Sequence, residues 1–179
     1  MEYFCYFCFV TITIIMASNL KTLSELNRKN IPNASNMRFG IIVSEWNEDI
    51  TDALLKGTYS TLIKHGAKEK NIITHYVPGS FELPLGAQLL LDTDKVDAVI
   101  CLGCVIQGET RHFEFISKAV ADGIIRVELD YNTPVIFGVL TTNTLQQAID
   151  RSGGKHGNKG DEAAMSAIKM VALKKGLMK

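Results

Sequence analysis

The sequence lacks an excess of charge of either sign. Its 179 residues include 19 lysines and arginines against 19 aspartates and glutamates. Proteins that bind nucleic acid or anionic membrane surfaces by electrostatic attraction usually carry a clear basic excess. The composition therefore argues against nucleic acid and membrane partners and favours small-molecule chemistry or self-assembly. Hydrophobic residues make up 46% of the chain, which is enough for one domain with a full core that needs no disulfide or metal.

Cysteine is also scarce, and the four that occur form two C-x-x-C pairs, Cys5 with Cys8 and Cys101 with Cys104. Such pairs can indicate zinc or redox chemistry. The second pair falls in or at the end of a predicted strand, where an odd separation points the two side chains to opposite faces. The first pair lies in an apolar leader. We therefore predict no metal site and interpret all four as reduced, apolar cysteines of a cytoplasmic protein.

A hydrophobic run long enough to span a bilayer is missing as well. Residues 2–15 are apolar and aromatic, but they are too few to cross a membrane and begin with Glu2 where a signal peptide has basic residues. Three interpretations remain open: a degenerate signal sequence, an unusual terminal extension, or residues upstream of a start at Met16. We favour the last, because an ordinary polar terminus begins there.

The next segment, residues 18–37, is rich in Asn, Lys and Ser and contains Pro32. Such a composition predicts an extended or partly helical arm outside the core. We therefore expect residues 1–37 to form a leader and arm, and residues 38–179 to form the domain.

From residue 38 onward, strand and helix patterns alternate. Continuous apolar runs predict strands at 39–43, 72–77, 98–105 and 135–140. Apolar residues at helical spacing predict a first helix, which Asn47 is expected to cap and His65-Gly66 to end, and further helices at 81–91, 113–127, 145–151 and 161–175. Strands that alternate with helices predict right-handed crossovers and a parallel sheet with helices on both faces, which is an α/β fold.

The stretch 103–115, GCVIQGETRHFEF, passes from the third predicted strand to the next helix. At such a crossing the free N–H groups and the dipole of the helix favour an anion. The spacing of Gly103 and Gly108 copies the phosphate-binding P-loop, except that Glu109 stands where the loop needs lysine. The sequence therefore argues against an ATP or GTP site and allows a smaller phosphate.

Ligands of a parallel α/β sheet bind beyond the carboxyl ends of the strands. Trp46-Asn47, residues 79–82 and residues 108–112 follow three of the predicted strands, so we expect them to converge on one rim. Trp46 could instead belong to the core, although its place beyond a strand favours stacking on a planar ring. For His112 two readings stay open: a satisfied histidine at a helix start, or a proton-transfer group beside an anion-binding turn.

A second basic candidate lies in the glycine-rich run 151–160, RSGGKHGNKG. Its basic side chains, Arg151 and Lys159 among them, could hold a phosphate. Such a run is just as often a solvated turn, and nothing in the sequence places it near His112.

Five stretches give the chain a resemblance to a known family. They are SEWNEDIT at Ser44, VPGSFELP at Val77, VDAVICLGCVIQGETRHFEF at Val96, PVIFGVLTTNTLQQAIDR at Pro134 and GNKGDEAA at Gly157. From about residue 38 to its end the chain resembles the lumazine synthases, enzymes of the penultimate step of riboflavin biosynthesis. Each stretch alone is weak, but together, in the family's order and without a large insertion, they are highly specific. The resemblance implies a three-layer α/β/α sandwich with a four-stranded, mainly parallel sheet, the flavodoxin-like lumazine synthase fold.

The resemblance also implies a reaction. A ribitylaminopyrimidinedione condenses with 3,4-dihydroxy-2-butanone 4-phosphate to give 6,7-dimethyl-8-ribityllumazine, phosphate and water. The ring amine attacks the ketone to form a Schiff base, phosphate is eliminated, and the ring closes. The resemblance implies that no metal or cofactor is required, and we expect the protein to be cytoplasmic.

Roles for individual residues follow from the same resemblance. His112 would be the general acid and base, and Trp46 would stack on the pyrimidine. The remaining contacts to the ring and the ribityl chain would come from Asn47, Ser80, Phe81, Glu82, and the backbone of Val105 and Ile106.

For the phosphate, the resemblance implies the turn Gly108, Glu109 and Thr110. Arg151 would be its main cationic partner, with Lys159 as a second candidate. Arg151 would come from a neighbouring subunit, and Phe137 would likewise reach across the interface to the bound ring.

Shared sites of this kind make the oligomer part of the mechanism. The resemblance implies a homo-pentamer, and in many members of the family twelve pentamers close into an icosahedral shell, whereas others stay as pentamers or form decamers. The run 151–160 lacks the longer loop of isolated pentamers, so a shell is allowed, and riboflavin synthase is a candidate partner. Two rival functions remain. A non-catalytic shell protein is disfavoured by the intact His112, Glu82 and Arg151. A flavodoxin-like electron carrier is disfavoured by the acidic run 45–49, which lacks a phosphate cradle.

Overall fold

The computed structural model describes residues 31–178 of the chain. The predictions about residues 2–15, the start at Met16 and the pair Cys5 and Cys8 therefore lie outside the described residues. Within the described part, no helix has the length and apolar character needed to cross a membrane.

Four parallel strands form a single sheet in the order β2-β1-β3-β4. They are β1 (Phe39–Ser44), β2 (Ile72–Val77), β3 (Ala98–Ile106) and β4 (Val135–Thr142). The inner strand β1 is buried along its whole length, and β3 is buried except at its last two residues. Burial on both faces explains why these strands appear in the sequence as continuous apolar runs. The predicted parallel α/β sheet is confirmed.

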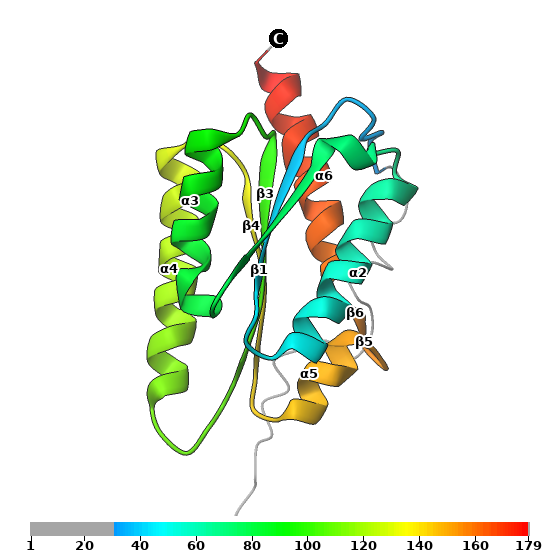
Figure 1. Cartoon of the computed structure of the whole chain (residues 1–179). Coiled ribbons are helices and arrows are strands. Elements are labelled where there is room, and N and C mark those ends of the chain that lie inside the picture. The colour runs from blue at the N-terminus through cyan, green and yellow to red at the C-terminus, as the bar shows by residue number, and fades with distance from the viewer. Residues whose placement is uncertain (1–30, 179) are drawn as a thin grey trace, which may run out of the picture.

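Helices cover both faces of the sheet, which gives three layers (Figure 1). α2 (Glu48–Lys64), α5 (Leu145–Arg151) and α6 (Lys159–Leu177) lie on one face, and α3 (Leu83–Thr93) and α4 (His112–Asp130) lie on the other. The core is divided in the same way. Ile41 packs with Leu54 and Ile168 on the first face, whereas the next residue, Ile42, packs with Leu83 and Ile124 on the second. Alternate residues of one strand therefore hold two helix layers.

Three local features differ from the sequence prediction. Residues 80–82 form a 3₁₀ turn, η2 (Ser80–Glu82), so α3 begins later than the predicted helix at 81–91 and carries Pro84 in its first turn. A second 3₁₀ turn, η1 (Glu69–Asn71), precedes β2. The glycine-rich run contains a short antiparallel hairpin of β5 (Ser152–Gly154) and β6 (Gly157–Asn158), which the sequence did not predict.

Cys101 and Cys104 belong to different core clusters, on opposite faces of the sheet. This confirms the predicted separation of their side chains, so the two thiols do not share one site. Burial raises the pKa of Cys101 to about 12 and that of Cys104 to about 11. Both thiols therefore stay protonated at neutral pH, whereas metal binding and nucleophilic attack need the thiolate.

The end of the predicted arm contributes to the core instead of lying outside it. Ala34 is fully buried and Met37 is 6% exposed, and both pack in the cluster beneath α2 and α6. Backbone hydrogen bonding from Ala34 to the His65 carbonyl fixes this segment against the end of α2. Apolar side chains spaced three apart in a polar segment are a weak signal of burial, so the sequence did not predict that this segment joins the core. The prediction for residues 1–30 lies outside the described residues.

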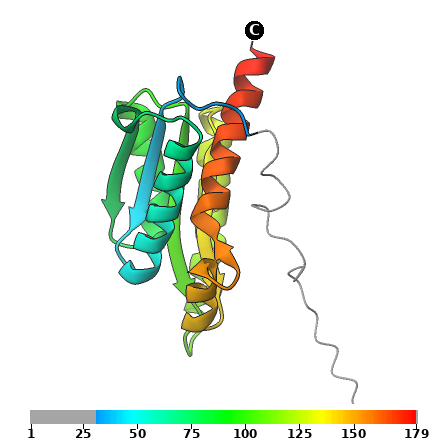
Figure 2. The ribbon, with the colours of Figure 1, turned by 90° about the vertical axis from the view of Figure 1, so that its right-hand side faces the viewer.

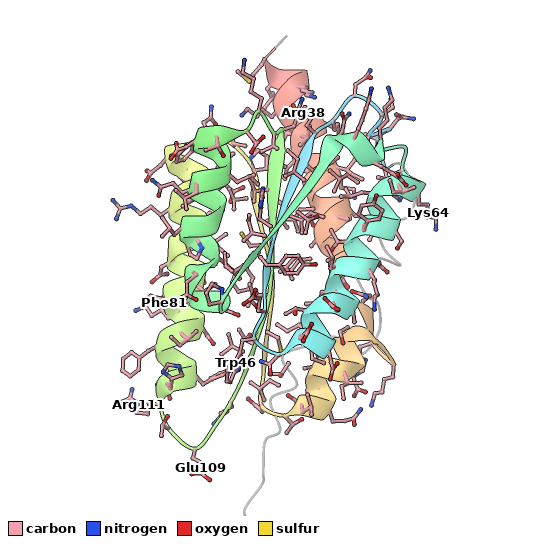
Figure 3. The ribbon with its side chains drawn as sticks, in the orientation of Figure 1. Arg38, Trp46, Lys64, Phe81, Glu109 and Arg111 are labelled. Atoms are coloured by element: carbon pink, nitrogen blue, oxygen red, sulfur yellow. The ribbon has the colours of Figure 1, made fainter. Side chains whose placement is uncertain are left out.

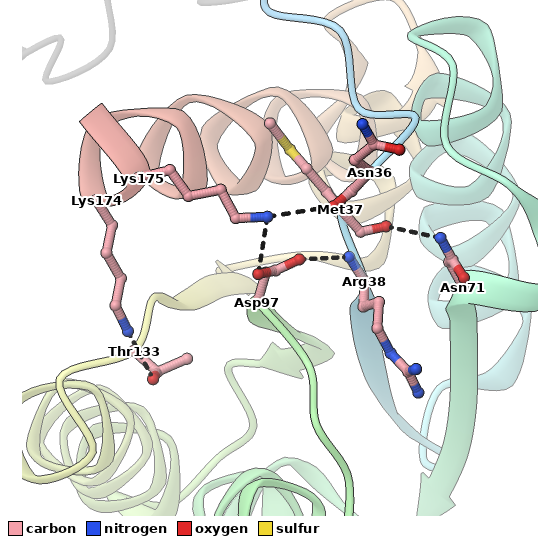
Figure 4. Close-up of polar contacts among 8 residues, drawn as sticks. All are labelled: Asn36, Met37, Arg38, Asn71, Asp97, Thr133, Lys174 and Lys175. Atoms are coloured by element: carbon pink, nitrogen blue, oxygen red, sulfur yellow. Dashed lines mark hydrogen bonds and ion pairs between the residues drawn. The ribbon is translucent and has the colours of Figure 1, made fainter. Parts of the chain in front are cut away.

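A polar cluster ties the same segment to the last turn of α6 (Figure 4). The Asp97 carboxylate accepts hydrogen bonds from the Arg38 backbone N–H at 2.7 Å and from Lys175 Nζ at 2.9 Å. Lys175 also donates to the Asn36 carbonyl at 3.2 Å. These contacts lie at the amino ends of the strands, so they fix the start of β1 far from its carboxyl end.

Close packing of α6 on α2, which run side by side in Figure 2, leads to a prediction about stability. A Cβ on Gly160 would lie 2.1 Å from the Leu54 carbonyl oxygen, whereas a Cβ on Gly176 of the same helix would meet no atom within 4 Å. Gly160→Ala must push the helices apart and should lower the free energy of unfolding by roughly 1–3 kcal/mol. Gly176→Ala should leave it unchanged or raise it by up to about 1 kcal/mol, because alanine favours the helix. Urea unfolding followed by circular dichroism measures both, and equal effects would contradict the close-approach explanation.

Candidate active site

The segments that follow β1, β2 and β3 lie at one end of the molecule. Figure 3 shows Trp46, Phe81 and Glu109 in the lower half of the molecule, with Arg38 and Lys64 in the upper half. Parallel strands send their carboxyl ends to the same edge of the sheet, so the loops that follow them meet there. The three segments therefore lie toward the same end of the sheet, and their convergence on one site stays a prediction.

Hydrogen bonds hold these segments to one another. The backbone N–H of Glu45 donates to the Val77 carbonyl at 2.8 Å, and that of Trp46 donates to the Pro78 carbonyl at 3.2 Å. Asn47 Nδ2 donates to the Cys104 carbonyl at 2.9 Å. The loop after β1 is therefore fixed both to the loop after β2 and to β3.

Asn47 occupies the cap position of α2, but its predicted role as a side-chain cap is wrong. Its φ of 63° and ψ of 47° are left-handed, and its side chain makes no cap hydrogen bond. A capping side chain needs an extended backbone to reach the free N–H groups of the helix. Asparagine tolerates the left-handed conformation, and here its amide instead crosses to the Cys104 carbonyl.

Two aromatic side chains are exposed on the rim. Trp46 is 73% exposed and Phe81 is 57% exposed. The core reading of Trp46 is therefore wrong. Large exposed aromatic groups beside polar ones are suited to stacking on a planar ligand.

Beneath the rim, Ser80 is buried, and its hydroxyl has no hydrogen-bond partner among the described residues. A Cβ on Gly103 would lie 2.7 Å from this hydroxyl and 2.9 Å from Leu83 Cδ1. Gly103 lies inside β3 rather than in a turn, so the resemblance to a P-loop does not extend to its backbone. A glycine is needed at position 103 because residues 79–83 approach the backbone of β3 closely there.

The turn from Gly108 to Arg111 is exposed and leads directly into α4. The Arg111 guanidinium contacts Glu114 at 3.0 Å and lies 5.6 Å from the centre of the Phe115 ring. Its positive charge is therefore partly compensated by these neighbours. His112 is exposed, and no hydrogen bond of its ring to another described residue is found. The reading of His112 as a satisfied structural histidine is therefore not supported.

Phe137, Arg151 and Lys159 come together elsewhere, in a cavity of about 300 Å³ beside the edge strand β4. The lining residues include none of the three rim segments. Arg151 Nη1 donates to the Gln147 carbonyl at 3.1 Å, and Lys159 Nζ contacts Glu162 Oε2 at 2.8 Å. One chain thus holds two separate groups of the predicted site residues.

Glu162 is the residue of this cavity that the sequence analysis missed. It is 6% exposed, and its carboxylate lines a cavity whose other charged side chains are Arg151 and Lys159. Its spacing of three residues after Lys159 on a helix was the available signal, because residues so spaced are neighbours on one helix face.

A parallel α/β sandwich with exposed aromatic, acidic and imidazole groups beyond its strand ends has the architecture of α/β proteins that bind small molecules at the strand termini. Residues 36–175 match the family model described as 6,7-dimethyl-8-ribityllumazine synthase, and the chain belongs to this family.

Relatives that carry the same name are similar to almost the whole chain. The protein of Cytophaga hutchinsonii is 60% identical over 157 residues, 88% of this chain and 98% of its own length. The protein of Phocaeicola vulgatus is 52% identical over 164 residues, 92% of this chain and 98% of its own. That of Parabacteroides distasonis is 53% identical over 156 residues, with coverage of 87% and 98%.

The geometry of Asn47 gives a testable difference between two substitutions. Asn47→Gly loses only the hydrogen bond to the Cys104 carbonyl and should lower the free energy of unfolding by about 1 kcal/mol. Asn47→Ala loses the same bond and also forces an alanine into the left-handed region, which should cost about 1 kcal/mol more. Urea unfolding of both variants measures the difference. Equal losses would show that the backbone at this position relaxes without strain.

Proposed function

We propose that this chain catalyses the condensation of 5-amino-6-(D-ribitylamino)pyrimidine-2,4-dione with 3,4-dihydroxy-2-butanone 4-phosphate to 6,7-dimethyl-8-ribityllumazine, phosphate and water. Membership of the 6,7-dimethyl-8-ribityllumazine synthase family supports the reaction. The observation that carries the proposal is that the loop after β1 is hydrogen-bonded both to the loop after β2, which leads to Glu82, and to β3, which leads to His112. These segments supply an aromatic surface, a carboxylate and an imidazole.

In the proposed complex the pyrimidine stacks on Trp46, whose exposure leaves its ring free. Two other candidates would act through their backbones, because the Asn47 amide is engaged with Cys104 and the Ser80 hydroxyl is buried. The other contacts to the ring and ribityl chain are assigned to Phe81, Glu82, Val105 and Ile106.

His112 is the proposed proton-transfer group. Forming the imine removes protons from the amine and releases water, and eliminating phosphate needs a proton taken from the neighbouring carbon. An imidazole can both accept and donate a proton, so it can serve both steps. The His112 ring is exposed at the first residue of α4 and makes no hydrogen bond to another described residue, which suits this role.

The butanone phosphate is assigned to the turn of Gly108, Glu109 and Thr110 at the start of α4, where helix N–H groups favour an anion. This turn carries an acid, and Arg111 is paired with Glu114, so a phosphate there needs a further cation. Arg151 has no acidic partner within 31–178 and lies at the open edge of the sheet.

We therefore propose that Arg151, with Phe137 and Lys159, completes the site of a neighbouring copy. The assembly would be a cytoplasmic homo-pentamer at least, with a shell of twelve pentamers and an association with riboflavin synthase as further proposals from the family resemblance.

The decisive experiment supplies both substrates to the purified protein and records its particle mass. Fluorescent lumazine formed by a colourless oligomeric protein would exclude both a non-catalytic shell protein and a flavin-containing electron carrier. An active monomer would contradict the shared site.

Replacing Arg151 tests the phosphate assignment. Arg151→Ala should raise KM for the phosphorylated butanone roughly 10- to 100-fold, the effect of losing a charge-assisted hydrogen bond, and leave pyrimidine binding nearly unchanged. Steady-state kinetics with each substrate varied in turn gives both values. Lys155 lies in the same glycine-rich run but does not line the cavity, so the Lys155→Ala variant should have wild-type kinetics. Equal losses for both substrates would mean that Arg151 is structural.

Replacing His112 tests the proton-transfer assignment. His112→Gln should lower kcat by about 100-fold, within the range for a positioned acid or base. His75→Gln removes an exposed histidine from the edge strand β2 and serves as the control. An unchanged kcat in His112→Gln, measured with both substrates saturating, would remove this residue from the mechanism.

A further inference from the structure

The cavity beside β4 contains a carboxylate that an anion site does not need. Glu162 lines this cavity together with Arg151 and Lys159, and its side chain is 7% exposed. A negative charge there repels a phosphate. Its presence therefore requires a reason.

The geometry shows what Glu162 touches. Its Oε2 lies 2.8 Å from Lys159 Nζ, and the lysine side chain is 39% exposed. The ammonium is therefore held by a largely buried partner, and two of its three N–H groups remain available toward the cavity. The charges of the pair sum to zero, which leaves Arg151 as the uncompensated cation among the described lining residues.

We infer that Glu162 is a positioning residue, which fixes the Lys159 ammonium and cancels its charge toward a bound phosphate. The inference rests on the proposed function, because it assigns roles within the proposed phosphate site. Lys159 then contributes directed hydrogen bonds, whereas Arg151 contributes the net attraction. A cavity with one net positive charge binds the phosphorylated substrate and still releases the phosphate product, which two free cations would retain.

The alternative is that Glu162 only supports the helix. Acids in the first turn of a helix favour its dipole, and α6 has two, Asp161 and Glu162. Asp161 supplies a matched control. It accepts a hydrogen bond from Thr61 at 3.1 Å, it carries the same charge in the same turn, and it does not line the cavity.

The test measures the dissociation constant of inorganic phosphate by calorimetry on the assembled protein, with inhibition against the butanone phosphate as a second readout. Glu162→Gln leaves Lys159 charged and uncompensated, so phosphate should bind roughly three- to tenfold more tightly. Lys159→Met leaves the Glu162 carboxylate unpaired and should weaken phosphate binding by a similar factor. The double variant removes both charges, so it should recover most of the affinity lost in Lys159→Met and stay weaker than wild type only by the lost hydrogen bonds of the ammonium, which is the signature of a cancelling pair.

Other outcomes would overturn the inference. If Glu162→Gln matches Asp161→Asn in phosphate affinity, Glu162 serves only the helix. If the double variant stays as weak as Lys159→Met, Lys159 attracts phosphate by itself and its charge is not cancelled. Arg151→Ala separates this inference from the proposed function. Loss of phosphate binding in Arg151→Ala without an effect of Glu162→Gln rejects the inference alone, whereas unchanged binding in Arg151→Ala rejects the proposed phosphate site.

Discussion

The common direction of the four strands is the constraint on which the rest of this structure depends. Because all of them run parallel, every strand delivers the chain to the same edge of the sheet, and helices begin there with free N–H groups. The backbone hydrogen bonds of Glu45 and Trp46 to the loop after β2 convert this common direction into a fixed surface. A reversed strand would send its loop to the end where Asp97 and Lys175 lie.

The same sheet leaves one edge open, and the charges are divided accordingly. The rim carries acids and an arginine already paired with Glu114, while the uncompensated guanidinium of Arg151 lies along β4. In the proposed function, the phosphorylated substrate needs both the rim of one chain and the Arg151 guanidinium of a neighbouring copy. Catalysis therefore depends on assembly. In this view Glu162 sets how much of the cavity's charge reaches the ligand.

Local patterns in the sequence predicted the elements well. Each strand was found to within two residues, because side chains buried on both faces leave a continuous apolar run. The helix at 145–151 was correct in full. The hairpin of β5 and β6 was missed because strands of three and two residues, built largely of glycine, have no period to detect. The common end of the loops after β1, β2 and β3 was predictable because it follows from strand direction alone.

The sequence by itself determined the fold class, the element order and which residue types stand at the strand ends, since these depend on side-chain period and on turn-forming residues. Tertiary structure decided which of those side chains remain available for chemistry. The Asn47 amide is taken by a carbonyl 57 residues away, Ser80 is buried under the rim, and Lys159 is paired with a buried acid. Availability depends on which groups meet after folding, because a hydrogen bond or ion pair acts only over a few ångströms, whatever the separation along the chain.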